Sequence, residues 1–193
     1  MTVNNFEQIK DFLTFEENTF YFLQIIKRRK ENPDMATGQR VLKSYYINST
    51  AYLDSKKEDI IKLCEDNNAR AYINLNKRSY EKVAIQMIKY LADAVYNKQH
   101  ENCKNAFEKI AGRNNADADK KWILDVDTKD QKLITEITAF LQTQRPEGDK
   151  VHIILETKAG FHIICSPFDP RGMRIQYNEI EIKKDNPTIL YIA

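Results

Sequence analysis

The sequence predicts an α+β fold with an antiparallel-containing sheet, and three of its features support this class. Short runs rich in aromatic and β-branched residues recur along the chain, as expected of strands. Longer segments with apolar residues at helical spacing separate several of these runs. Only five glycines and five prolines occur among the 193 residues, which leaves little of the chain for irregular structure. Strands and helices mixed at this density are typical of an α+β domain.

The first half of the chain contains three expected strands and three expected helices. The strands lie at residues 19–26, 41–47 and 69–75. The helices cover residues 55–65, a longer segment that Ser79 caps, and residues 102–110. The apolar residues expected on or near one face of the longer helix are Val83, Ile85, Ile88, Leu91 and Val95. Residues 1–110 are therefore expected to form an N-terminal α/β module.

The second half of the chain is expected to have a different order of elements, in which one strand and one helix are followed by strands only. A strand at residues 121–127 precedes a helix at residues 131–142. Four further strands lie at residues 151–156, 161–165, 179–183 and 188–192. The first two of these form a hairpin around the turn TKAG. Residues 111–193 are thus expected to form a second module, and the two modules together a single domain.

The overall composition restricts the class of protein without identifying a partner. The formal net charge is +2 and hydrophobic residues make up 42% of the chain, so a core can form and nucleic-acid binding is neither demanded nor excluded. No apolar run approaches the ~18 residues of a membrane-spanning helix, and the polar N-terminus does not resemble a signal peptide. The three cysteines are widely spaced and odd in number, which argues against a disulfide framework. We therefore expect a cytoplasmic protein that does not bind a membrane.

Two aspartates, Asp125 and Asp127, lie two residues apart at the end of the expected strand WILDVD. Side chains at this spacing on a strand point to the same face of a sheet. Adjacent carboxylates repel one another, and a bound divalent cation removes this cost. Mg²⁺ and Mn²⁺ prefer oxygen ligands, so the pair predicts a metal site suited to phosphoryl transfer. The alternative is that the two acids only end a strand at the surface.

The expected hairpin turn brings Lys158, Gly160 and His162 close together. Gly160 can adopt a positive φ and allow the backbone to approach a ligand closely. The N–H groups of such a turn can bind phosphate oxygens, while Lys158 adds a positive charge and His162 adds a donor at the start of the next strand. These residues predict a nucleotide-binding turn. The alternative is a plain β-hairpin with a surface lysine and a packed histidine.

The runs WILDVD and TKAGFHII together resemble two motifs of the archaeo-eukaryotic primase superfamily. The first motif of that family has apolar residues followed by Asp-x-Asp, and the second ends in a histidine on a strand after a turn with Ser or Gly. The second run is similar to the form found in polymerase domains of bacterial end-joining ligases. The resemblance implies a primase-polymerase fold, in which an α/β module packs on a sheet of the RNA-recognition-motif type and the active site lies between them.

The resemblance also implies a reaction and its participants. Asp125 and Asp127 would bind Mg²⁺ or Mn²⁺, with Asp185 or Glu181 as a third acid, and His162 would hold a nucleoside triphosphate. The reaction would be primer synthesis, or extension of a primer on a template, by a nucleotidyltransferase. Its partners would be nucleoside triphosphates and a DNA template, single-stranded or primed. A separately encoded helicase is a further candidate partner.

A triphosphate shared by these groups predicts their geometry. The strand that carries the two aspartates should lie in the same sheet as the strand that carries His162. Their carboxylate and imidazole groups should lie within ~10 Å, because Mg–O distances are only ~2.1 Å.

Two basic segments are candidates for contact with the template. The loop at residues 27–40 contains Arg28, Arg29 and Arg40 next to strands rich in Phe and Tyr. Basic groups bind phosphates, and exposed aromatic rings can stack on bases. The resemblance implies that a second set, around the strand ARAYINL, faces nucleotide or template. This set consists of Arg70, Lys77 and Arg78. Solvated charge is the alternative for both segments.

Two other functions stay open from the sequence alone. A nuclease of the Asp…Glu-x-Lys type would join Asp125 or Asp127 to Glu156 and Lys158. Against it, a helix separates the two strands concerned, and Lys158 falls in a turn. A nucleic-acid-binding accessory protein, in contrast, would keep the primase fold and lose catalysis.

Overall fold

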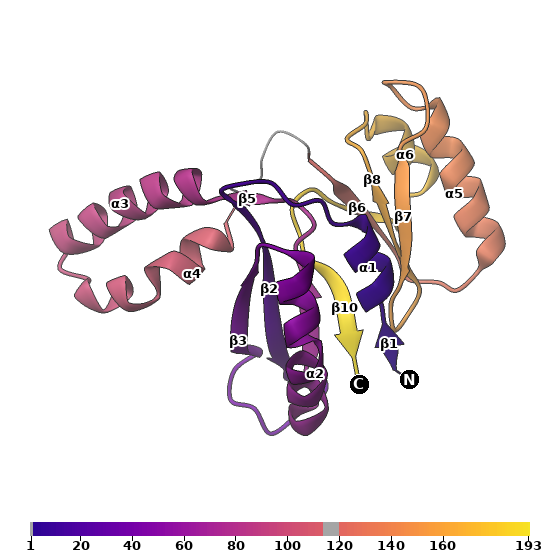
Figure 1. Ribbon diagram of the computed structural model, residues 1–193. Helices are drawn as coiled ribbons and strands as arrows, with labels where there is room; N and C mark the ends of the chain where they lie inside the picture. Colours follow the sequence, from indigo (N-terminus) through magenta and orange to yellow (C-terminus); the bar gives the residue numbers. More distant parts are fainter. Residues whose placement is uncertain (1, 114–119) are drawn as a thin grey trace.

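The computed structural model describes residues 2–113 and 120–193 of the chain, which fold into two antiparallel sheets with helices around them (Figure 1). Within these residues there are six α-helices, a six-stranded sheet and a four-stranded sheet. The expected α+β class is therefore confirmed. In the same part of the chain, no helix has both the length and the apolar character that crossing a membrane requires.

The first sheet has the strand order β1-β10-β4-β2-β3, with the short strand β5 paired to β2. Its strands are β1 (Val3–Asn4), β2 (Thr19–Arg28), β3 (Gln39–Ile47), β4 (Arg70–Ile73), β5 (Arg78–Ser79) and β10 (Thr188–Ile192). Helices α1 (Phe6–Phe12) and α2 (Thr50–Asn67) bury apolar residues together with one face of this sheet. That face carries Leu23, Ile25 and Ile73, which are fully buried. Because side chains alternate along a strand, the neighbouring residues point to the opposite face.

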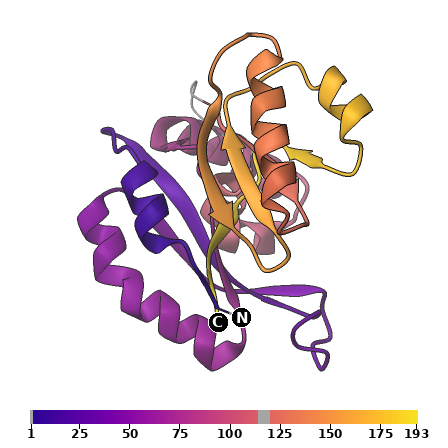
Figure 2. The ribbon, with the colours of Figure 1, turned by 90° about the vertical axis from the view of Figure 1, so that its right-hand side faces the viewer.

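The second sheet has the order β7-β8-β6-β9. Its strands are β6 (Trp122–Val126), β7 (Val151–Glu156), β8 (Phe161–Cys165) and β9 (Glu181–Lys183). Helices α5 (Gln131–Thr143) and α6 (Arg171–Gln176) lie on one face, where α5 crosses in front of β7 and β8 in Figure 2. On the other face, Ile123, Leu155 and Ile164 join the core of the first sheet. The two sheets therefore share one core.

Helices α3 (Tyr80–Tyr96) and α4 (Ala106–Ala111) form an arm that extends away from both sheets, with a 3₁₀ turn at His100–Asn105 between them (Figure 1). The Ser79 hydroxyl accepts a hydrogen bond from the Lys82 N–H, so the expected cap is confirmed. The expected inward face of α3 is wrong in part, because Ile85, Ile88 and Val95 are exposed. Only one side of a projecting helix meets a neighbour, and on α3 that side carries the buried Val83 and Ala94.

Most expected elements occur near their expected positions, and β7, β8 and β10 have the expected bounds. The elements without a sequence prediction are β1, α1, β5 and α6. The division at residue 110 needs one correction, since β10 inserts between β1 and β4 of the first sheet. All five residues of β10 are buried, so this strand completes the N-terminal core rather than extending the second sheet.

Candidate active site

A hollow of about 740 Å³ lies between the two sheets and contains most of the side chains expected to act on a nucleotide. From the second sheet and its turn it is lined by Asp125, Asp127, Lys158, His162 and Lys183. From the first sheet it is lined by Arg28, Arg70, Tyr72 and Ile189. Segments far apart in the chain therefore meet at one place, and acidic and basic groups face one another across it.

Asp125 lies on β6 directly opposite His162 on β8, so the two expected strands are neighbours in one sheet. The Asp125 Oδ1 atom is 3.2 Å from His162 Nε2, and the expected proximity is confirmed. The second carboxylate oxygen of Asp125 contacts the ammonium group of Lys183 on β9. On its other side, His162 Nδ1 is 2.7 Å from the hydroxyl of the buried Thr188. Asp125 and His162 are thus tied to β10 of the first sheet.

The electrostatics of this cluster keep Asp125 ionised. Its hydrogen bond with His162 and its contact with Lys183 outweigh partial burial and lower the pKa of the carboxyl group to about 2. For Lys183, burial lowers the pKa of the ammonium group, but the contacts with Asp125 and Glu181 outweigh it and raise the pKa overall. An ionised Asp125 only accepts hydrogen bonds, so Nε2 of His162 carries a proton. The other ring nitrogen, Nδ1, pairs with the Thr188 hydroxyl and fixes the ring from its opposite side.

Asp127 lies one residue beyond the end of β6 and is exposed, whereas Asp125 is partly buried. The sequence placed both acids on the strand, and the structure places only Asp125 there. Both still line the same hollow. The contact of Asp125 with an ammonium group indicates that this carboxylate attracts a cation. Two carboxylates that face one hollow fit the oxygen-ligand preference of Mg²⁺ or Mn²⁺.

The two candidates for a third acid lie in different surroundings. Glu181 is directly opposite Asp125 on β9, is 71% exposed, and has Oε2 3.3 Å from Lys183 Nζ. Neither acid lines the hollow of Asp125, and Asp185 binds Arg78 and Asn76 instead. The geometry therefore favours Glu181 over Asp185 as a neighbour of Asp125. Among residues 2–113 and 120–193, no group of three or more His, Cys, Asp or Glu side chains is already arranged to hold a metal.

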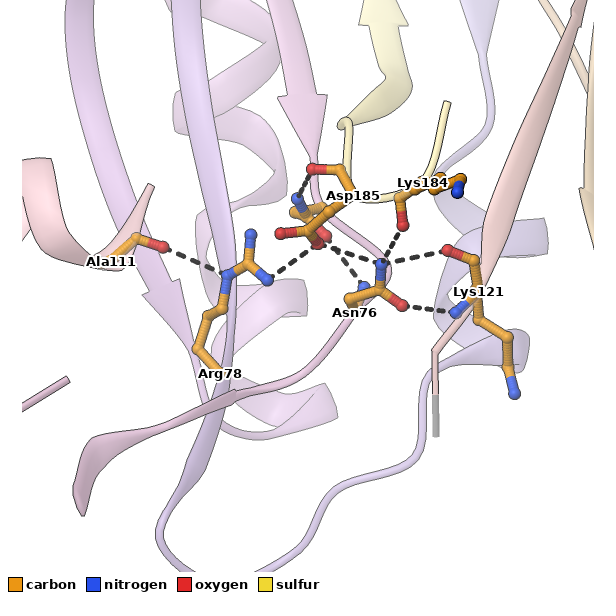
Figure 3. Close-up of polar contacts among 7 residues, drawn as sticks. Asn76, Arg78, Ala111, Lys121, Lys184 and Asp185 are labelled. Atoms are coloured by element: carbon orange, nitrogen blue, oxygen red, sulfur yellow. Dashed lines mark hydrogen bonds and ion pairs between the residues drawn. The ribbon is translucent and has the colours of Figure 1, made fainter. Parts of the chain in front are cut away.

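Arg78 is fully buried, which corrects its expected role on a template surface. Figure 3 shows its polar contacts. Its Nε donates to the carbonyl oxygen of Ala111 at 3.1 Å, and its Nη1 donates to Asp185 Oδ1 at 2.9 Å. The Asn76 side-chain amide also donates to Asp185 Oδ1, at 3.0 Å. Asn76 Nδ2 bonds the Lys121 carbonyl oxygen as well, at 3.0 Å, just before β6. These contacts join the arm, the first sheet and the approach to the second sheet.

The other basic candidates divide into three kinds. Arg28 and Arg70 line the hollow, where Arg28 Nη1 donates to the Tyr72 hydroxyl at 3.2 Å and Arg70 Nη2 pairs with Glu31 at 2.5 Å. Arg29 and Arg40 are exposed in the β2–β3 hairpin and do not line the hollow. Lys77 is largely buried and pairs with Glu16, so its ammonium group does not face the hollow either. Only part of each basic segment is therefore placed to meet a ligand bound by the aspartates.

Gly160 is needed for close packing rather than for a positive φ. A Cβ atom at this position would lie 2.0 Å from the carbonyl oxygen of Val126 and 2.5 Å from the amide nitrogen of Thr128. The Gly160 N–H donates to the Thr157 hydroxyl at 3.0 Å, so it is not free to bind phosphate as the sequence had indicated. The turn therefore presses on residues 126–128, and this contact holds the backbone of Asp127 beside the hairpin.

We expect Gly160→Ala to destabilise the protein by about 1–3 kcal/mol, as overpacking of a closely packed site does. The added methyl group must displace the segment that carries Asp127, so the nucleotide transfer expected from the sequence should fall as well. Gly38→Ala is the matched control, because a Cβ atom there meets nothing within 4 Å. Urea denaturation of both variants measures the difference. Equal stability of the two would contradict the close approach.

Several residues of the site had no signal in the sequence. Lys183 and Thr188 reach it only because β9 and β10 lie beside β6 and β4. Tyr72 could have been suspected, since strand alternation sets it on the opposite face from Ala71 and Ile73. The assignment rests on the chemistry and position of these side chains. Comparisons of the chain with protein-family models, with curated proteins and with solved structures give no match.

Proposed function

We propose that the protein is a metal-dependent nucleotidyltransferase of the primase-polymerase type, which makes or extends a primer on a template. One observation carries the proposal. Asp125, Asp127, Lys158 and His162, the residues that resemble the two primase motifs, line one hollow between two sheets. The basic side chains around that hollow fit a triphosphate, whose charge would otherwise be repelled by the two acids.

Each side chain has a task in this reaction. Lys158, with Arg28 across the hollow, binds phosphate oxygens of the incoming nucleotide. His162 orients Asp125 through Nε2 and is itself held by Thr188. Asp125 and Asp127 would hold Mg²⁺ or Mn²⁺, which supplies neutralisation of the developing charge when bound. Lys183 would then release Asp125 to the metal and turn toward Glu181 or the phosphates.

The reaction joins a primer hydroxyl to a nucleotide. The 3′ oxygen of the primer attacks the α-phosphorus of the triphosphate and forms a new P–O bond. The bond between the α-phosphorus and the bridging oxygen breaks, and pyrophosphate leaves with that oxygen. The proton of the 3′ hydroxyl passes to water, and the protein contributes position and charge rather than a covalent intermediate.

The test is an assay of primer synthesis and primer extension with labelled nucleotides, a single-stranded template and Mn²⁺. We expect labelled products longer than the starting primer, and their length should depend on the template. Template binding without any product, under ribonucleotides or deoxynucleotides and under Mg²⁺ or Mn²⁺, would instead favour the accessory protein without catalysis.

A nuclease of the Asp…Glu-x-Lys type would need Glu156 in the active site and would not need His162. Glu156 pairs with Phe161 on β8, whereas Leu155 lies opposite His162, so Glu156 points away from the face of Asp125. Its carboxylate accepts a hydrogen bond from Lys129 at 2.9 Å and does not line the hollow. The geometry therefore favours nucleotide transfer over this type of nuclease.

We expect Glu156→Gln to keep more than half of the nucleotide transfer, and His162→Ala to lower it about 10- to 100-fold, the usual cost of losing an outer partner of a metal ligand. Parallel incubation with labelled DNA and Mg²⁺, without free nucleotides, tests for cleavage. Metal-dependent cleavage that Glu156→Gln abolishes and His162→Ala spares would overturn the proposal.

A further inference from the structure

The face of the first sheet opposite α2 carries a row of side chains that begins at the candidate active site. Ile189 on β10 is directly opposite Tyr72 on β4, which is opposite Gln24 on β2, which is opposite Ser44 on β3. Residues in register across antiparallel strands share one face of the sheet. Three spacings between strands separate the ends of the row, a distance of about 14 Å.

Three hollows lie along this row, and neighbouring hollows share lining residues. The hollow of the candidate site includes Tyr72 and Pro187, which also line a small neighbouring hollow of about 60 Å³. That small hollow includes Phe22, Gln24 and Gly112, which also line a third hollow of about 910 Å³. Together the three hollows mark a path, called the groove below, from the aspartates across the sheet to the base of the arm.

The far end of the groove combines an aromatic wall, an acceptor and two cations. Tyr46 is partly exposed, with its ring stacked on Phe22 at 5.6 Å between centroids. Beside it, Glu108 of α4 accepts hydrogen bonds from Gln24, at 3.1 Å, and from the Ser44 hydroxyl. Both of these bonds go to Oε1, and none of the described contacts uses Oε2.

The two cations at this end are Lys109 and Arg113. They lie over the ring of Tyr90, at 5.0 and 5.5 Å from its centroid, and both line the large hollow. At the opposite end of the groove, Arg28 and Lys158 line the candidate site. A polyanion that follows the groove would therefore meet positive charge at both ends and the rings of Tyr72 and Tyr46 along its length, the combination typical of single-strand binding.

We propose that this groove binds single-stranded nucleic acid and leads it into the hollow of Asp125 and Asp127. The strand's phosphates contact Lys109 and Arg113, and one unstacked base lies against Tyr46 with its amino group donating to Glu108. About four nucleotides span the row at the rise of ~3.4 Å per stacked base. Only the naming of this strand as the template rests on the proposed nucleotide transfer, because binding itself needs neither metal nor nucleotide.

The first test measures binding of a fluorescein-labelled ten-nucleotide DNA strand by fluorescence anisotropy at several salt concentrations, without metal or nucleotides. Replacing both Lys109 and Arg113 with Ala should weaken binding about tenfold or more at low salt. The slope of log affinity against log salt should become shallower by about 1.4, or ~0.7 for each lost contact. The matched control replaces Lys62 and Lys132, exposed on α2 and α5, and should change neither quantity.

The second test examines whether the amino group of the bound base donates to Glu108. Cytosine presents an amino donor that thymine lacks, so oligo-dC should bind several-fold more tightly than oligo-dT of equal length. Glu108→Gln should bring this ratio close to one while leaving the salt slope unchanged. Circular dichroism verifies that each variant is folded before its binding is compared.

The outcomes separate this inference from the proposed function. An unchanged affinity and slope in the Lys109 and Arg113 variant would overturn the groove as the binding path. A poly-glutamate peptide that binds as tightly as DNA and loses affinity equally in this variant would also overturn it, in favour of a general anion surface. Normal strand binding by a protein that transfers no nucleotides would instead refute the enzyme and leave the groove in place.

Discussion

Neither Asp125→Asn nor Asp127→Asn is expected to support nucleotide transfer. Each change removes one negative charge from the hollow while preserving the size of the side chain, so the proposed divalent cation would lose a ligand. We expect a fall of at least about a thousandfold, which corresponds to roughly 4 kcal/mol of transition-state stabilisation. Incorporation of labelled nucleotides with Mn²⁺, at matched metal concentrations, measures the effect.

The two variants should differ in stability. Asp125 binds His162 and Lys183, so Asp125→Asn leaves a half-buried ammonium group without its main partner and should lower the melting temperature. Asp127 is exposed, and its replacement should leave the melting temperature within about a degree or two of the parent. Glu136→Gln, an exposed change from acid to amide on α5, is the control for both. Full activity in either aspartate variant would show that the pair is not the catalytic centre.

Asp185→Ala should produce the largest loss of stability, about 3–5 kcal/mol, because it leaves the buried charge of Arg78 unpaired. Burial of Arg78 already costs free energy, because its Nη2 atom is buried and forms no hydrogen bond within the described part of the chain. Removal of the carboxylate also takes an acceptor from Asn76. Urea denaturation measures the change in the free energy of unfolding.

Asp169→Ala provides the matched control for this loss. Asp169 also pairs with an arginine, Arg171, but the arginine side chain is 86% exposed. Such a surface pair contributes little, and the exposed bond from the Arg171 N–H to Asp169 adds only a cap, so the change should cost about 1 kcal/mol. An activity assay on the folded fraction of Asp185→Ala separates a structural role from a metal-binding one. Loss of nucleotide transfer without loss of stability would instead support Asp185 as a metal ligand.

The local pattern of residues was sufficient to predict most strands and helices. Runs of aromatic and β-branched residues and the turn TKAG predicted β7 and β8 with their observed bounds, and Ser79 correctly predicted the start of α3. Such signals depend on neighbours in the chain. The exposure of Ile85 and Ile88 depends instead on where the arm points, which no local pattern describes. The sheet that β10 joins likewise depends on which edge is open after the other strands have paired.

Some residues of the candidate site were also predicted from the sequence, and others were not. Asp125 and His162 were expected together because their motifs place them on strands that a shared ligand must join. Arg78 was misplaced because a charged residue beside a strand is usually solvated, and only tertiary structure shows its buried partners. Gly160 was identified correctly, but for the wrong reason: its neighbours across the sheet, not its φ, exclude a side chain.

The insertion of β10 between β1 and β4 has a consequence for the order in which the protein can fold during synthesis. Both neighbours of this strand emerge from the ribosome well before residues 188–192 are made. Until then, the nascent chain exposes two strand edges that can pair with other chains, a risk that chaperones commonly limit. Thr188 arrives with the same strand, so the hydroxyl group that holds His162, and through it Asp125, is among the last parts to reach its place. Assembly of the candidate site is therefore coupled to completion of the first sheet.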